Sequence, residues 1–244
     1  MLTQMLDKIR IVLCQPTHPG NIGAVARAMK NMGLTRLTLV APENYPHAEA
    51  TARASGADDV LENAVITQTF DEAIQDCQWV FGTSARSREF PWPQLTPKEA
   101  ANKAIFLTLE NEVAFVFGQE RAGLTNEQLQ SCDYHLCIPT NPGYASLNLG
   151  AAVQVIVYEI FQAYLAQTET PTPVTEFAQK ATKDEITGLL SHFEAVSIQV
   201  GFMDPKHPKK LLPRLKRLFT KAHLEQEEVN ILRGFLKMVG KRES

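Results

Sequence analysis

The segment IRIVL (residues 9–13), followed after a short loop by PGNIGAVARAM (residues 19–29), decides the fold of this chain. The first part is rich in β-branched residues and predicts a buried strand. In the second part Asn21 is a good helix N-cap, and apolar residues then recur at helical spacing. A strand, a tight loop and a helix N-terminus form a common arrangement for holding an anionic group.

One arginine lies on this short predicted helix. Arg27 falls off the apolar stripe and follows Gly23 by four residues. We therefore expect Gly23 to leave open space beside the Arg27 guanidinium. The alternative is an ordinary strand–helix unit with a solvated surface arginine, and this segment alone leaves both interpretations open.

Composition restricts the class of protein. The chain has 244 residues, with 44% hydrophobic and 21% charged residues, which is typical of a soluble protein of one large or two smaller domains. No apolar run approaches the length of a membrane span, and residues 1–8 do not have the order of a signal peptide. We therefore expect a cytoplasmic protein without a membrane partner.

The cysteines and histidines do not form metal-binding motifs. Cys14, Cys77, Cys132 and Cys137 include no Cys-x-x-Cys pair, and we expect them to be buried, reduced thiols. The six histidines include no His-x-x-x-His pair. The sequence therefore predicts no metal site.

Charge is distributed unevenly along the chain. Residues 206–244 carry eleven Lys or Arg and four acidic residues, a net charge of +7. Because the net charge of the whole chain is −3, residues 1–205 carry a net charge of −10. An acidic body with a basic tail indicates that a polyanion docks partly on the tail.

The first 165 residues alternate strand-like and helix-like segments. We expect strands at 9–13, 36–40, 79–83, 113–117 and 134–138, and helices at 22–32, 71–76, 97–104, 125–131 and 148–165. This alternation predicts an α/β domain over residues 1–165, with a mostly parallel sheet and helices on both faces. The helix at 148–165 is apolar around much of its surface, which indicates burial on more than one side and a candidate subunit interface.

The C-terminal part has a different composition. Residues 166–180 form a Thr/Pro-rich linker, and residues 181–244 predict a small all-α domain that opens with a Thr182–Glu185 capping box. Residues 206–221 hold seven basic and no acidic side chains, interleaved with Leu and Phe. We interpret this segment as a helix with one phosphate-binding side, and the alternative is a merely solvated face.

Three further loops follow predicted strands. The loop FGQERAGLT (residues 117–125) has the spacing of a P-loop, but Leu124 stands where the phosphate-binding lysine belongs, so we exclude a nucleotide hydrolase. The other two are IPTNPGYASLNL (residues 138–149) and GTSARSR (residues 82–88). Ligands of open α/β sheets bind at the carboxyl ends of the strands, and small polar residues there suit a nucleoside-like ligand.

These loops together resemble a known family. Residues 21–27, 117–124 and 138–149 are similar to the three motifs of the SpoU (TrmH) branch of the SPOUT RNA 2'-O-methyltransferases, over nearly all of residues 8–165. With residues 83–88, the Pro91-Trp92-Pro93 segment and the helical extension, the chain is most similar to the bacterial tRNA (cytidine/uridine-2'-O)-methyltransferases within that branch. Ala145 stands where a serine is common.

The resemblance implies a trefoil-knotted domain, S-adenosylmethionine as methyl donor with S-adenosylhomocysteine as product, no metal, and a homodimer with interfacial active sites. The catalytic residues it implies are Arg27, Ser146 and Asn148. The cofactor-binding residues it implies are Thr83, Ser84, Ala85, Gly118, Ile138, Ala145, Ser146 and Leu147. The candidate RNA-binding residues are Arg86, Arg88, Arg121, Lys209, Lys210, Arg214, Lys216 and Arg217.

The expected substrate is tRNA, methylated on the ribose of the first anticodon-loop nucleotide, a cytidine or uridine at position 32. Because a guanidinium stays protonated, we expect Arg27 to bind phosphate and stabilise developing negative charge, and the general base remains open. Two alternatives are a ribosomal RNA methyltransferase of the same branch and a non-catalytic RNA-binding protein on the same scaffold.

Overall fold

The computed structural model describes residues 3–84, 94–168, 179–207 and 210–241. By its internal contacts the chain divides into two compact units, Met1–Ile74 with Trp79–Thr175, and Gln75–Gln78 with Glu176–Ser244. The predicted domain boundaries stay predictions, because most of the proposed linker at 166–180 lies outside the described residues.

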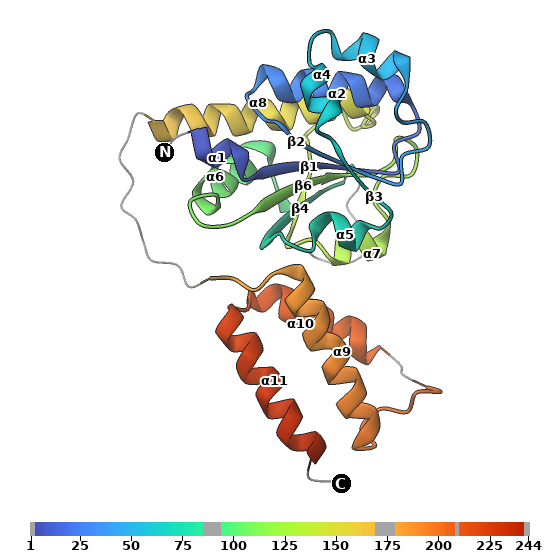
Figure 1. Cartoon of the computed structure of the whole chain (residues 1–244), viewed down its shortest axis with the longest axis vertical. Helices are drawn as coiled ribbons and strands as arrows, with labels where there is room; N and C mark the ends of the chain where they lie inside the picture. Colours follow the sequence, from blue (N-terminus) through green and yellow to red (C-terminus); the bar gives the residue numbers. More distant parts are fainter. Residues whose placement is uncertain (1–2, 85–93, 169–178, 208–209, 242–244) are drawn as a thin grey trace. The chain divides into compact units, whose positions relative to one another are not determined.

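The first unit is built on a seven-stranded sheet with the order β3-β2-β1-β6-β4-β7-β5 (Figure 1). Every neighbouring pair of strands is parallel. The strands are β1 Ile9–Cys14, β2 Arg36–Val40, β3 Val65–Thr67, β4 Trp79–Thr83, β5 Gln94–Leu95, β6 Val113–Phe117 and β7 Tyr134–Leu136. The mostly parallel α/β sheet is confirmed, and the two short edge strands β3 and β5 are additions to the predicted set.

Helices connect the strands and cover both faces of the sheet. In the first unit they are α1 Thr3–Asp7, α2 Pro19–Asn31, α3 Ala48–Ala54, α4 Asp58–Glu62, α5 Phe70–Ile74, α6 Pro97–Leu107, α7 Asn126–Gln130 and α8 Leu149–Thr168. Helix α8 packs against both α2 and α6, whereas Figure 1 shows α5 and α7 on the opposite face. Helices α1, α3 and α4 carry no signal that the sequence analysis used.

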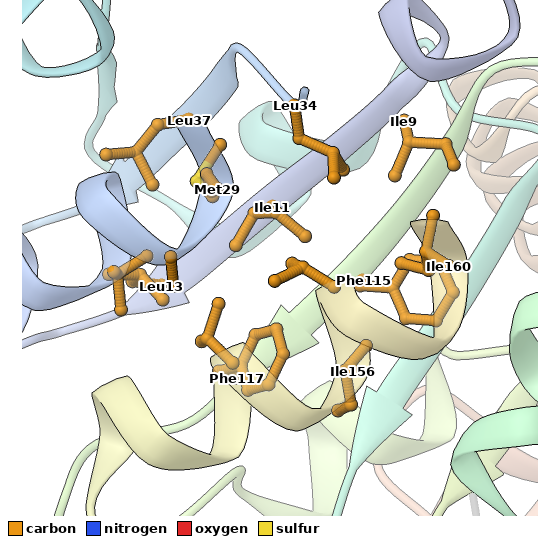
Figure 2. Packing of buried hydrophobic residues seen from close by; sticks show 14 of the residues in the cluster. Ile9, Ile11, Leu13, Met29, Leu34, Leu37, Phe115, Phe117, Ile156 and Ile160 are labelled. Atoms are coloured by element: carbon orange, nitrogen blue, oxygen red, sulfur yellow. The ribbon is translucent and has the colours of Figure 1, made fainter. Parts of the chain in front are cut away.

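The main core lies between the sheet and the layer of α2, α6 and α8. Figure 2 shows Ile11 and Leu13 of β1 packing with Phe115 and Phe117 of β6, and with Ile156 of α8. Alternate residues of β1 point to the other face of the sheet, where Val12 is equally buried. Burial on both faces explains why the strands read as nearly continuous apolar runs.

The thiols are mostly core residues. Cys14, Cys77 and Cys132 are buried, and Cys137 is half-buried. Burial raises the pKa of the Cys14 thiol to about 12, so this group stays protonated at neutral pH.

Helix α8 corrects one expectation from the sequence. Its segment Leu149–Gln167 is 19 residues long with a mean hydropathy of 1.4, so by length and composition it is apolar enough to cross a membrane. In the structure Val153, Ile156, Val157 and Ile160 of this helix belong to the main core. Burial in the core therefore accounts for one side of α8, while Val155, Tyr158 and Leu165 are exposed on the other side.

Helix α2 differs from two further expectations from the sequence. The helix begins at Pro19 rather than after Asn21, and its N-cap is His18, whose Nδ1 accepts a hydrogen bond from the Gly20 amide at 3.2 Å. The predicted open space at Gly23 is also wrong. A Cβ at Gly23 would lie 2.1 Å from the carbonyl oxygen of Ala50, because α3 packs directly against α2 at this point.

The second unit is helical. Its described residues form α9 Lys183–Gln199, α10 Leu211–Ala222 and α11 Gln226–Lys241. The Thr182–Glu185 capping box is present at the start of α9, with the Thr182 amide donating to the Glu185 carboxylate at 2.8 Å. A separate small core around Leu189, Phe219 and Leu236 holds the three helices together.

The close contact at Gly23 gives a stability prediction. We expect Gly23→Ala to lower the free energy of unfolding by roughly 1–3 kcal/mol in a urea titration, because the added methyl group must displace the α3 backbone. Gly20→Ala is the matched control in the same helix, since the nearest atoms to its Cβ would belong to the side chains of Glu49 and His18 and not to backbone. Equal stability of the two variants would contradict this packing.

Candidate functional site

A cavity of about 370 Å³ opens at the carboxyl ends of β4, β6 and β7. The loops at residues 82–88, 117–125 and 138–149 contribute to its walls, whereas the first motif at residues 21–27 does not. Its walls are formed by Thr83, Ser84, Phe117, Gly118, Gln119, Glu120, Arg121, Ala122, Gly123, Leu124, Leu136, Ile138, Thr140, Ala145, Ser146, Leu147, Leu149 and Ala152. The volume and the mixture of apolar walls with a few polar groups are typical of a small-molecule site.

The loop after β6 forms one wall by folding tightly on itself. The Gly123 amide donates to the Gln119 carbonyl at 2.8 Å, which closes the turn. A Cβ at Gly118 would lie 2.0 Å from the carbonyl carbon of Gly123, so only glycine fits at this position. The P-loop-like spacing of the two glycines therefore serves a compact hairpin-like turn.

The loop that leads into α8 forms the opposite wall. Its turn is fixed by the Asn141 side chain, which accepts a hydrogen bond from the Gly143 amide at 3.0 Å, and by the Tyr144 amide, which donates to the Asn141 carbonyl at 2.8 Å. Tyr144 is exposed next to the lining residues Ala145 and Ser146. This turn determines how the third motif enters the cavity.

The ends of β4 and β7 form the floor. Thr83 donates its hydroxyl to the Val116 carbonyl at 2.9 Å, and the Ser84 amide donates to the Leu136 carbonyl at 2.9 Å. These bonds join three neighbouring strands at the point where the cavity begins.

Glu120 connects the motif loops. One oxygen of its carboxylate accepts hydrogen bonds from the Thr17 amide and hydroxyl, both at 3.1 Å. The other oxygen accepts from the His18 amide at 3.2 Å and from the Asn21 side-chain amide at 3.0 Å. The carboxylate therefore holds the loop between β1 and α2 against the loop after β6.

Asn21 extends this connection to α8. Its Oδ1 accepts a hydrogen bond from the Asn148 side-chain amide at 2.9 Å, while Asn148 Oδ1 accepts from the Gly150 amide at 2.9 Å and caps α8. Glu120, Asn21 and Asn148 thus form a chain of side chains, called here the motif relay, that ties all three motifs together. The sequence analysis assigned Asn21 a capping role, and the structure gives it this bridging one.

The protonation state of Glu120 follows from its surroundings. Partial burial opposes ionisation, but the hydrogen bonds from Asn21, Thr17 and His18 outweigh it and hold the pKa of Glu120 below its ordinary value. Glu120 is therefore an ionised acceptor at neutral pH and a structural anchor, poorly suited to act as a general base.

The predicted site residues separate into groups. Of the cofactor-binding set, Thr83, Ser84, Gly118, Ile138, Ala145, Ser146 and Leu147 line the cavity, and Ala85 lies outside the described residues. Arg121, expected to contact RNA, also lines the cavity. Of the catalytic set only Ser146 lines it, whereas Asn148 belongs to the motif relay and Arg27 is exposed on α2.

The remaining predicted RNA-binding residues are distributed over two regions. Arg86, Arg88 and Lys209 lie outside the described residues. Lys210 immediately precedes α10 and makes no side-chain capping hydrogen bond, and Arg214, Lys216 and Arg217 lie within the helix. Within the described part of the chain, no group of three or more His, Cys, Asp or Glu side chains is placed to hold a metal ion.

Comparison with known proteins agrees with this geometry. Residues 8–158 match the model of the SpoU rRNA Methylase family, and residues 184–244 match the C-terminal domain of the tRNA methyltransferase TrmJ. The chain belongs to the SpoU methylase family.

Within the family it is similar to proteins named TrmJ along nearly its whole length. It is 49% identical to the tRNA (cytidine/uridine/adenosine-2'-O-)-methyltransferase TrmJ of Pseudomonas aeruginosa, over 95% of this chain and 93% of that protein. The crystal structure of TrmJ from Z. mobilis superposes with a TM-score of 0.82 at 33% identity, covering 94% of this chain and 98% of that one. A probable methylase family protein from Haemophilus influenzae gives a TM-score of 0.66 at 42% identity, covering 97% of both chains.

The motif relay gives a prediction for pH-dependent stability. We expect Glu120→Gln to lower the free energy of unfolding at pH 7 by about 1–3 kcal/mol, because an amide cannot accept all four hydrogen bonds. The pKa of Glu120 is lower in the folded protein than in the unfolded chain. Its contribution to the free energy of unfolding is therefore fully present above the ordinary glutamate pKa, and it is lost as the pH falls through the pKa of the folded protein. The difference between the two proteins should therefore shrink on acidification, in urea titrations at several pH values. A difference that stays constant or grows on acidification would contradict the assignment.

Proposed function

We propose that this protein transfers a methyl group from S-adenosylmethionine to a ribose 2'-hydroxyl of tRNA, at the first anticodon-loop nucleotide, a cytidine or uridine at position 32. The observation that carries the proposal is that the second and third motifs, together with the end of β4, line one cavity at the carboxyl ends of β4, β6 and β7. The similarity to TrmJ proteins along both units supports tRNA over ribosomal RNA as the substrate. We place the enzyme in the cytoplasm, where tRNA is processed.

The residues of the cavity suit this cofactor. Leu124, Leu136, Ile138 and Leu149 supply apolar surface for a base, while Thr83, Ser84 and Ser146 supply hydroxyl groups for a ribose. S-adenosylmethionine would supply a methyl group activated by its sulfonium: the ribose oxygen would bond to the methyl carbon as the carbon–sulfur bond breaks, leaving S-adenosylhomocysteine and releasing the hydroxyl proton. The work of the chain is therefore to orient the two substrates and to stabilise negative charge on the oxygen.

Arg27 has the charge needed to stabilise negative charge on the ribose oxygen, but within one chain it does not lie at the cavity. Its guanidinium stays protonated, binds phosphate bidentately and favours negative charge on a nearby oxygen. However, Arg27 is exposed on α2 and does not line the cavity of its own chain. We infer that the reacting centre combines Arg27 of one subunit with the cavity of a second.

The exposed face of α8 supports such a homodimer. Val155, Tyr158 and Leu165 are 37%, 47% and 40% exposed and follow one another at helical spacing, on the side opposite the core residues Ile156 and Ile160. Exposed apolar side chains in a stripe are typical of an interface between subunits. We propose that this stripe forms the dimer contact, and the trefoil knot implied by the family resemblance stays a prediction.

Helix α10 supports the RNA-binding role of the second unit. Lys210, Arg214, Arg217 and Lys221 are spaced four, three and four residues apart, which places them on one side of the helix. Lys216 lies about 200° around the helix from Arg214, so it does not share that side. We therefore add Lys221 to the proposed phosphate-binding residues, and Arg86, Arg88, Arg121 and Lys209 remain further candidates.

The activity itself is tested with purified protein, unmodified tRNA and S-adenosylmethionine that carries a tritiated methyl group. We expect label in tRNA and a single gap in an alkaline hydrolysis ladder at position 32, because a 2'-O-methyl group blocks cleavage there. Label in ribosomal RNA alone would favour the second methyltransferase alternative. Cofactor and RNA binding without transfer would favour a non-catalytic protein.

Arg27 gives the sharpest catalytic prediction. Arg27→Ala should reduce methyl transfer by about 100- to 1,000-fold while S-adenosylmethionine binding is kept, because the removed group stabilises charge outside the cofactor cavity. Arg27→Lys should also fail, since an ammonium cannot reproduce a planar two-point contact. Lys30→Ala is the matched control on the same helix, where Lys30 pairs with Asp59 at 2.7 Å. Arg27→Ala activity within a few-fold of the Lys30→Ala value would refute the role.

The dimer is tested by charge insertion. We expect Tyr158→Glu to give a monomer in sedimentation velocity at micromolar concentration and to abolish transfer, because a carboxylate cannot be buried unpaired in an apolar contact. Val65→Glu, a similarly exposed apolar position on the edge strand β3, should remain dimeric and active. A dimeric and active Tyr158→Glu protein would exclude this face as the interface.

The basic side of α10 is tested by salt dependence. We expect the triple change of Arg214, Arg217 and Lys221 to Ala to weaken tRNA binding and to flatten the log–log salt dependence, by roughly 0.7–0.9 for each phosphate that is no longer bound. The single change Lys216→Ala should alter the tRNA affinity and the salt slope less than the single change of Arg214, Arg217 or Lys221 to Ala. An unchanged salt slope in the triple variant would show that these charges are only solvated.

A further inference from the structure

Helix α11 of the C-terminal unit has two apolar stripes. Val229, Leu232, Leu236 and Val239 face the small core of this unit, and α11 packs there against α9. A second stripe of Ile231, Phe235 and Met238 points outward, with exposed fractions of 69%, 66% and 61%. We call it the outer stripe. Large apolar side chains grouped in this way are unusual on a free surface.

A glycine lies in the middle of the outer stripe. Gly234 is in the interior of α11, and a Cβ added there would meet nothing within 4 Å. Glycine in a helix interior costs roughly 0.5–1 kcal/mol relative to alanine, and no contact inside the unit requires it. Ile231, Gly234, Phe235 and Met238 follow the i, i+3, i+4, i+7 spacing of a helix that packs against another helix.

We propose that the outer stripe pairs with the same stripe of a second copy of this chain, with the two α11 helices antiparallel. The stripe runs from Ile231 to Met238 with Gly234 near its midpoint. In an antiparallel pair centred there, Ile231 of each copy lies opposite Met238 of the other, and the two glycines let the backbones approach closely. Such a self-complementary arrangement has the two-fold symmetry that most homodimers use.

The charges of α11 favour this orientation. The first turn carries Glu227 and Glu228, whereas the second half carries Lys237 and Lys241. Antiparallel pairing brings the acidic end of each helix to the basic end of the other, and parallel pairing would bring like charges together. A tRNA partner fits less well, because the central residues of the stripe are apolar and carry no charge. The inference goes beyond the proposed methyl transfer and does not depend on it.

Cysteine cross-linking of the full-length chain tests the pairing. Gly234→Cys places a thiol at the proposed two-fold axis, where the free space around Gly234 accommodates it. A disulfide needs Cα atoms within roughly 7 Å, so rapid formation reports a close helix pair. The matched control is Ser191→Cys, an exposed position on α9, and the unsubstituted chain shows the background from its own four cysteines.

We expect mild oxidation to give a covalent dimer of Gly234→Cys at least tenfold faster than of Ser191→Cys. Adding Phe235→Glu should remove the difference, because it places like charges at the centre of the contact. Equal rates for the two cysteine variants, or no effect of Phe235→Glu, would overturn the proposal. Two other results would equally overturn the proposal. A Gly234→Cys thiol that does not cross-link but always resists alkylation would show that another part of the chain covers the outer stripe. A thiol that resists alkylation only with added tRNA would show that RNA covers it.

Discussion

The site depends on one half-buried acceptor, the carboxylate of Glu120. Four hydrogen bonds from Thr17, His18 and Asn21 end on its two oxygens, and Asn21 passes the connection to Asn148 at the start of α8. Three segments that are distant in the sequence are thereby held together, and two of them, the loops after β6 and β7, line the cavity. Since loops are otherwise the most mobile parts of a parallel α/β fold, this relay supplies the rigidity that a small-molecule site requires.

The proposed sites for chemistry and for RNA recognition lie in different parts of the chain. The residues that line the cavity belong to the first unit, whereas the basic side of α10 belongs to the second. The proposed homodimer would account both for the exposed stripe of α8 and for the position of Arg27 outside the cavity of its own chain. In that dimer a single subunit would lack Arg27 at its cavity, so methyl transfer would require assembly.

Most of the sheet could be predicted because buried parallel strands such as Val113–Phe117 are apolar on both faces. The short edge strands Val65–Thr67 and Gln94–Leu95 could not, since only a few residues pair and Val65 and Ile66 remain exposed. The grouping of residues from the loops after β4, β6 and β7 around one cavity was also expected from the sequence, whereas the place of the first motif outside that cavity was not. The errors at α2 are tertiary in origin: Asn21 binds Glu120 instead of capping the helix, and the unforeseen helix α3 occupies the space at Gly23.

The central claim is that the motif relay holds the loops after β6 and β7 in place at the proposed cofactor cavity, and a double-mutant cycle measures that coupling. S-adenosylmethionine binding would be followed by calorimetry for the unsubstituted chain, Asn21→Ala, Glu120→Ala and the double variant. Because the two side chains form one hydrogen-bonded unit, the losses should be non-additive, with a coupling free energy of about 1 kcal/mol or more. Additive losses, or full cofactor affinity in Glu120→Ala, would contradict the account.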